Sequence, residues 1–440
     1  MSSTTSTVAQ ELSTRKIGPV IISFAGTKLT QKESQLLASP NVGGVVLFRE
    51  NWEKDSANPK TALKAFIASC RAINKNLIFM VDHEGGKIWR FVKSEGEISP
   101  EETFTRIPSA KSIGIEYDKD NVAGLKSAYE NGYIMASELR DCGVDCSLAP
   151  VLDLDGPSNV IGKLERGFHK NPFITAKLTE AFIRGMNAAG MHATAKHFPG
   201  HGTCLADSHT ETPVDNRPIK ELVKDLFPFR ENIRKRKLGA VMPGHFICPA
   251  VDPNHPAGFS DIWIKRLLRE KYKFDGVVMS DCLSMAGATV GSGSGLDRLL
   301  AAQSAGCDFL MLTHQHNTPD HPDPNKRHLL LDHLLSVIDT IPDTPDSARR
   351  RAEFAIGPTP KKTEDCKDSG ESQQVAMQAA IGTLTRAATT TTTATSEIST
   401  TVSPVMSQLR DAKKSGALYN QQQNTAQPQN TQPVRSVLNT

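Results

Sequence analysis

The chain has 440 residues and a formal net charge of +3; apolar residues make up 38% of it and charged residues 22%. This length suits two or three average domains or one large α/β barrel with additional segments, and the near-neutral charge gives no support to nucleic-acid or membrane-surface binding. No apolar run approaches the roughly 18 residues of a membrane-spanning helix, and the first residues lack the layout of a secretory signal, so we expect a cytoplasmic protein.

Short apolar or β-branched runs recur along the chain and predict eight strands. In order they are Pro19–Phe24, Gly43–Phe48, Asn76–Val81, Val144–Ala149, Met191–Ala195, Leu238–Met242, Gly276–Met279 and Asp308–Leu312. Such runs are typical of a parallel sheet that is buried on both faces. Segments between them, such as Leu178–Ala189 and Ile262–Lys271, predict helices. Eight alternating βα units predict a single TIM-type (β/α)₈ barrel over residues 17–358, with a doubly wound open sheet as the alternative.

The two ends of the chain differ in composition from this region. Residues 1–16 are polar and are expected to be flexible, and residues 359–440 are rich in Thr, Gln, Asn, Ser and Ala. A low-complexity segment of this kind has little apolar surface to bury, so it is predicted to be a largely disordered tail. The eight cysteines match neither a zinc nor a redox motif and are expected to be buried, reduced thiols.

Ionisable residues follow five consecutive predicted strands, and in a parallel barrel these strand ends share the catalytic face. Asp281 lies at the tip of the seventh strand, where a rigidly placed carboxylate can attack an anomeric carbon. His209 lies two residues after Asp207, and an Asp–His pair can act first as general acid and then as general base near neutral pH. A carboxylate nucleophile with a separate proton donor is the arrangement of a retaining glycosidase.

Five segments also carry a family resemblance: VDHEGGKIWRF, APVLDLD, KHFPGHG, ADSHTETP and GVVMSDCLSMAG. They resemble the signature blocks of family-3 glycoside hydrolases and are most similar to those of the bacterial β-N-acetylglucosaminidases of cell-wall recycling. The similarity runs from about Gly18 to Ala355. It implies a retaining exo-β-N-acetylglucosaminidase that releases terminal β-linked GlcNAc from GlcNAc–anhydro-muropeptides, without a metal or an organic cofactor.

The resemblance also implies roles for the matching residues. Asp281 would be the nucleophile, with His209 and Asp207 as the acid/base dyad. The residues expected to hold the sugar are Asp82, Arg90, Arg166, Lys196 and His197. The sequence departs from the family pattern at Cys282, where a second Asp is common, and around Arg166, where the segment is about two residues longer. We expect a carbohydrate substrate as the partner, no nucleic-acid or membrane partner, and a monomer.

Three alternatives stay open at this point. The histidines that follow the strands could instead ligate a metal ion, although their spacing matches no compact metal motif. A histidine acid/base does not repel an anionic acceptor as a carboxylate does, so a family-3 phosphorylase is possible. The third alternative is a barrel that binds sugar without cleaving it, and it would predict loss of the nucleophile or the dyad.

Overall fold

A computed structural model of the chain describes residues 16–52, 56–91, 100–288, 294–313, 331–332 and 334–358. The predicted tail over residues 359–440 lies outside these residues, as does nearly all of the predicted flexible N-terminus.

The strands form two parallel sheets. The first has the order β10-β1-β2-β3-β6 and the second β7-β8-β9. Their bounds are β1 (Val20–Ile22), β2 (Val42–Leu47), β3 (Ile78–Val81), β6 (Cys146–Ser147), β7 (Ala193–Phe198), β8 (Leu238–Pro243), β9 (Val277–Val278) and β10 (Leu310–Met311). Each overlaps one of the eight predicted runs, so the prediction of an α/β fold with parallel strands is confirmed. An antiparallel hairpin that was not predicted, β4 (His83–Gly85) with β5 (Ile88–Trp89), follows β3.

The single closed barrel is not confirmed, because the two sheets are joined by isolated bridges rather than by continuous strand pairing. One bridge links Val151 to Lys196, and the other links Met279 to Phe309. Near the first, Pro150 has no N–H group with which to extend the pairing of β6. Near the second, the Asp308 carboxylate accepts a hydrogen bond of 2.8 Å from the backbone N–H of Val278. Backbone hydrogen bonds still cross each junction, from the Thr194 N–H to the Ala149 carbonyl oxygen at 2.8 Å and from the Ser280 N–H to the Phe309 carbonyl oxygen at 2.9 Å, but the pairing there is limited to single bridges.

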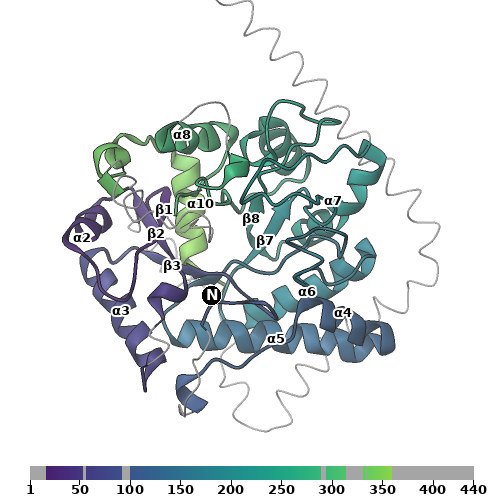
Figure 1. Cartoon of the computed structure of the whole chain (residues 1–440), viewed down its shortest axis with the longest axis horizontal. Coiled ribbons are helices and arrows are strands. Elements are labelled where there is room, and N and C mark those ends of the chain that lie inside the picture. Colours follow the sequence, from purple (N-terminus) through teal and green to yellow (C-terminus); the bar gives the residue numbers. More distant parts are fainter. Residues whose placement is uncertain are drawn as a thin grey trace, which may run out of the picture.

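Helices surround the strands (Figure 1). They are α2 (Gln31–Ala38), α3 (Pro59–Ile73), α4 (Ala110–Lys119), α5 (Asn121–Asp141), α6 (Pro172–Ala188), α7 (Ile219–Arg234), α8 (Gly295–Ala305) and α10 (Pro345–Ile356), with short 3₁₀ turns η1 (Arg49–Asn51), η2 (Pro100–Glu102), η3 (Ala257–Phe259), η5 (Ala286–Ala288) and η6 (Ile338–Thr340). The predicted helix Leu178–Ala189 falls within α6 apart from its last residue. The other predicted helix is present as η4 (Ile262–Lys271), but its turns are π-helical.

Local sequence accounts for where several helices begin. Thr30 and Glu33 form a capping box at the start of α2, in which each side chain accepts a hydrogen bond from the other's backbone N–H. Asn171 caps α6 and is followed by Pro172, whose missing N–H costs nothing in the first turn. These signals begin the helices at the ends of the strand-to-helix loops, where the polar side chains of the site also lie.

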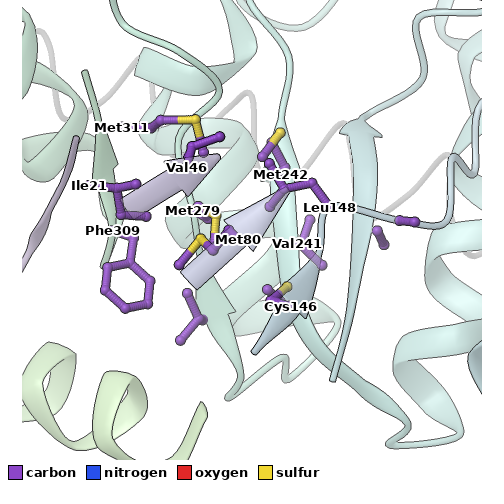
Figure 2. Packing of buried hydrophobic residues seen from close by; sticks show 14 of the residues in the cluster. Ile21, Val46, Met80, Cys146, Leu148, Val241, Met242, Met279, Phe309 and Met311 are labelled. Carbon is purple, nitrogen blue, oxygen red and sulfur yellow. The ribbon is translucent and has the colours of Figure 1, made fainter. Parts of the chain in front are cut away.

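The core is shared by both sheets. Figure 2 shows side chains from the first sheet, such as Val46 and Met80, meeting side chains from the second, such as Val241 and Met242. All four are at most 2% exposed. Continuous burial of this kind explains why the strands read as unbroken apolar runs.

Two further expectations concern buried, reduced cysteines and the lack of a membrane-spanning helix. All seven described cysteines are buried thiols that form no disulfide within the described residues, as predicted. Within this part of the chain, no helix combines the length and the apolar character needed to cross a membrane.

Candidate active site

A cavity of about 210 Å³ lies where the carboxyl ends of the strands converge, and all eight predicted site residues line it. Asp82 directly follows β3, Lys196 and His197 belong to the second half of β7, and Asp281 comes three residues after β9. The remaining four, on loops or the β5 hairpin, are Arg90, Arg166, Asp207 and His209. Parallel strands place their carboxyl ends at one edge, and this is why residues up to 199 positions apart meet here.

The wall that follows β3 is built from alternating charges. The Lys196 ammonium contacts Asp82 Oδ1 at 2.7 Å and Glu84 Oε1 at 2.6 Å. Arg166 holds the same Glu84 carboxylate with two hydrogen bonds, from Nε at 2.8 Å and from Nη2 at 2.7 Å. The side chains of Lys196 and Glu84 are only 2% and 7% exposed. The pairs therefore lie largely out of water, where charge-assisted hydrogen bonds are strong and geometrically specific.

The ion pairs determine the charge state of the groups in this network. Burial alone would raise the pKa of Glu84, but Arg166 and Lys196 outweigh it and lower the pKa to about 2. The pKa of Asp82 lies far below its usual range, because Lys196 and Arg90 outweigh the opposing effect of burial. Burial would lower the pKa of Lys196, yet Asp82 and Glu84 raise it. These groups are all charged at neutral pH.

Arg90 is held more loosely than the rest of this wall. Its Nη2 lies 3.5 Å from Asp82 Oδ2, and its guanidinium stacks 5.8 Å from the centre of the Phe48 ring. One third of its side chain is exposed. Arg90 can therefore turn toward a ligand without breaking a tight ion pair.

A second buried carboxylate, Asp153, holds the segment after β7. It is fully buried. Its Oδ1 accepts hydrogen bonds from the backbone N–H of His197 at 3.1 Å and of His201 at 2.8 Å. Its Oδ2 lies 2.7 Å from His197 Nδ1. Although burial opposes ionisation, His197 and the other donors lower the pKa of Asp153.

Asp281 lines the cavity and is partly buried. Its Oδ1 accepts a hydrogen bond of 2.7 Å from the backbone N–H of Cys282. Burial would raise the pKa of Asp281, but His197, His245 and that N–H lower it below its ordinary value. The Cys282 thiol turns to Thr313 Oγ1 at 3.0 Å and Ser284 Oγ at 2.9 Å. Asp281 is thus an ionised carboxylate with a fixed orientation, as a nucleophile requires.

Asp207 and His209 form a pair on the loop after β7. His209 Nδ1 donates to Asp207 Oδ1 at 2.6 Å, and the two side chains are 42% and 38% exposed. The hydrogen bond from His209, which outweighs the effect of burial, lowers the pKa of Asp207. The loop is tied to η5 by the N–H of Gly287, which donates to Ser208 at 2.9 Å. His209 lines the cavity and is partly exposed to solvent, so its imidazole can exchange a proton there.

The glycines that precede this loop serve close packing. A Cβ on Gly200, whose φ is +135°, would lie 2.5 Å from Asp225 Cβ, and one on Gly202 would lie 2.1 Å from the Leu154 carbonyl oxygen. Both distances are far below van der Waals contact. Glycine is therefore needed at these two positions because two chain segments approach each other closely, and not because the loop has to be flexible.

Histidines gather around the cavity without forming a metal cluster. In the part of the chain that the structure describes, no three His, Cys, Asp or Glu side chains are placed to hold a metal ion. His83 is fully buried against Trp89, with ring centres 3.6 Å apart, and burial lowers its pKa to about 3. His245 is also fully buried and stacks on Phe259. These two histidines belong to the packing around the site.

Two residues of this site were not singled out from the sequence, although both lie within the motif segments. Glu84 comes two residues after Asp82, and it pairs with two of the predicted binding residues. Asp153 lies in the segment after β6 and holds His197. Several of the predicted binding residues are cations without an assigned carboxylate partner. A carboxylate within the same motif segments is the signal that would have pointed to Glu84. For Asp153 the sequence carries no comparable signal.

Comparison with known proteins gives consistent matches. The glycosyl hydrolase family 3 N-terminal domain matches residues 9–347. A protein named beta-hexosaminidase from Aromatoleum aromaticum is 45% identical over 309 residues, covering 70% of this chain and 81% of its own length. Another beta-hexosaminidase, from Bordetella avium, is 42% identical over 334 residues, covering 76% and 87%. The solved structure of NagZ from Neisseria gonorrhoeae in complex with N-trifluoroacetyl-D-glucosamine is 37% identical and matches with a TM-score of 0.67, covering 84% of this chain and 98% of that one.

Proposed function

The chain belongs to glycosyl hydrolase family 3, and we propose that it is a retaining exo-β-N-acetylglucosaminidase that works through a covalent bond to Asp281. It is a glycoside hydrolase of the beta-hexosaminidase type. The observation that carries the finer proposal is that an ionised carboxylate and a separate Asp–His pair line one cavity with a charged sugar-holding wall. That combination suits double displacement at an anomeric carbon.

In the first step Asp281 attacks the anomeric carbon as the bond to the leaving oxygen breaks. His209 gives that oxygen its proton from Nε2, while Asp207 accepts the hydrogen bond from Nδ1 and stabilises the imidazolium beforehand. In the second step the neutral His209 removes a proton from water, and the resulting hydroxide displaces Asp281. Two inversions at the same carbon give net retention.

The charged wall would bind the hydroxyl and N-acetyl groups of the sugar. Asp82 and Lys196 are rigidly paired, so they suit hydroxyl groups at fixed positions. Arg166 has its guanidinium oriented by Glu84, and Arg90 is free to turn toward the ligand. His197 faces the same cavity. The N-acylated glucosamine in complex with the Neisseria protein supports an N-acetylglucosamine substrate.

We infer that the two sheets act as one (β/α)₈ barrel within residues 17–358, since the bridges at Val151 and Met279 place them edge to edge. The proposed substrate is a GlcNAc–anhydro-muropeptide, hydrolysed in the cytoplasm by a monomer without a cofactor.

Activity on 4-nitrophenyl N-acetyl-β-D-glucosaminide tests the proposal with the full chain. Wild type should release nitrophenol. Asp281→Asn should lose roughly 10³-fold or more in kcat, as expected for a missing nucleophile. His209→Ala should show an initial burst followed by slow turnover, because nitrophenol leaves with little help from an acid and the loss falls on the attack by water.

Other outcomes would redirect the proposal. Cleavage of only a β-glucoside would keep the family and refute the N-acetylglucosamine specificity. Formation of a sugar phosphate when phosphate is added would indicate a phosphorylase. An inert wild type on every β-glycoside tested would leave a barrel that only binds sugar.

A further inference from the structure

The two oxygens of the Asp153 carboxylate have separate partners. Oδ1 accepts both backbone N–H hydrogen bonds, from His197 and His201. Among the described residues, the partner of Oδ2 is the His197 imidazole, at 2.7 Å. One oxygen therefore holds the backbone, and the other contacts the side chain that reaches the cavity.

The charge of Asp153 decides where the proton of His197 resides. An ionised carboxylate has no proton to donate, so a nitrogen at 2.7 Å from Oδ2 must carry the hydrogen. His197 Nδ1 is thereby protonated whether the ring is neutral or charged, and Nε2 is the nitrogen left for the cavity. Asp153 itself does not line the cavity, whereas His197 and Asp281 both do.

We propose that Asp153 is a positioning residue that keeps the proton of His197 on Nδ1, so that Nε2 faces the sugar beside Asp281 as an acceptor in the neutral ring or a donor in the charged ring. This inference rests on the proposed function for its kinetic consequence. The proton position itself is a property of the free protein. Asp153 thus sets the chemistry of a binding residue without touching the substrate itself.

A purely structural role is the competing explanation. The two bonds to Oδ1 hold the backbone after β7, and they alone could account for a buried Asp at this position. Asp153→Asn separates the two explanations, because the amide oxygen can keep both backbone bonds. The amide NH₂ then faces His197 Nδ1 and donates to it, which moves the proton to Nε2.

The first measurement is the ¹⁵N NMR spectrum of the histidine side chains in the full chain without substrate, with His197 assigned by the signal lost in His197→Gln. We expect a proton on Nδ1 in wild type and, for the neutral ring, a proton on Nε2 in Asp153→Asn. A neutral wild-type ring protonated only on Nε2 would overturn the inference, whatever the activity and whether or not the variant folds.

The second measurement is kinetic. Asp153→Asn should lower kcat/KM by roughly 10- to 100-fold, by analogy with the loss of a hydrogen bond that orients a metal-ligating histidine, while its thermal unfolding stays close to that of wild type. Unchanged kinetics together with the altered tautomer would overturn the positioning role. If no β-hexosaminide is cleaved by wild type, the proposed function fails, and the NMR result still decides the proton position.

Asp252 offers a matched control. Its Oδ1 accepts the backbone N–H of Asn254 at 3.0 Å, and its Oδ2 lies 3.3 Å from His255 Nδ1, away from the cavity. Asp252→Asn therefore disturbs a similar Asp–His pair. We expect its kcat/KM to match that of wild type, and an equal loss in both variants would show that the effect of Asp153→Asn is not specific to His197.

Discussion

Glu84 is the residue whose replacement tests the electrostatics of the site most directly. It holds Arg166 through two hydrogen bonds and Lys196 through a contact of 2.6 Å. Gln at this position keeps the shape of the side chain but removes its charge. Lys196 would then keep its contact with Asp82, and Arg166 its hydrogen bond of 3.0 Å to the Val160 carbonyl oxygen, in a region where little water can compensate for the lost charge.

The magnitude follows from the ionisation of Glu84. Its pKa falls from 4.5 to about 2 on folding, which at about 1.4 kcal/mol for each tenfold change corresponds to about 3 kcal/mol of stability. A carboxyl group whose pKa is lowered in the folded state contributes this stability fully above the unfolded pKa near 4.5. The contribution is lost as the pH falls through about 2, the folded value.

Urea unfolding of wild type and Glu84→Gln over pH 2 to 7 measures this contribution. We expect the variant to be about 3 kcal/mol less stable at pH 7 and the difference to shrink steadily below about pH 5. Glu165→Gln is the control, because Glu165 pairs with Lys87 at 3.3 Å on an exposed surface and should matter much less. A difference that stays constant down to pH 2, or no difference at pH 7, would show that the charge of Glu84 does not stabilise the folded state.

Three further predictions concern packing and binding. Gly200→Ala should cost at least about 1–3 kcal/mol by urea unfolding, because of its φ of +135° and its contact with Asp225; Gly26→Ala, with a φ of +77° and open space around it, should cost less. Arg166→Lys should raise KM by about tenfold or more with a smaller change in kcat, since lysine cannot make the two-pronged contact with Glu84 and a charge-assisted hydrogen bond contributes about 1.5–3 kcal/mol. An unchanged KM would argue that Arg166 does not bind the sugar. Phe309→Ala should destabilise the chain by about 3–5 kcal/mol in the same unfolding assay, as expected for a fully buried aromatic side chain, and a cost below about 1 kcal/mol would mean that the core repacks freely.

Much of the fold was predictable because the strands are buried on both faces. Runs such as Gly43–Phe48 contain no polar residue, and each of them overlaps an observed strand. The interruption of strand pairing was not predictable in the same way. It depends on the backbone N–H that Pro150 lacks and on the Asp308 side chain, which accepts a backbone hydrogen bond from a neighbouring strand. The hydrophobic pattern alone does not show such tertiary contacts.

The set of residues that line the cavity was predictable for a related reason. Polar residues that follow parallel strands converge at one edge, so Asp82, Lys196 and Asp281 meet although they are far apart in sequence. What the pattern could not show is which charges pair. Glu84 and Asp153 contact predicted binding residues in ways that depend on the final packing, and a pattern of residue types does not distinguish them from ordinary polar neighbours.

The proposed mechanism requires that a sugar becomes covalently bound to Asp281. A fluorinated N-acetylglucosaminyl fluoride, in which fluorine slows the second step more than the first, should allow this adduct to accumulate. Mass spectrometry of a proteolytic digest is then expected to find the added sugar on the peptide that contains Asp281, and to find none in Asp281→Asn. A sugar attached to a different carboxylate, or an active enzyme whose product has inverted anomeric configuration and which forms no adduct, would exclude Asp281 as the nucleophile of a retaining mechanism.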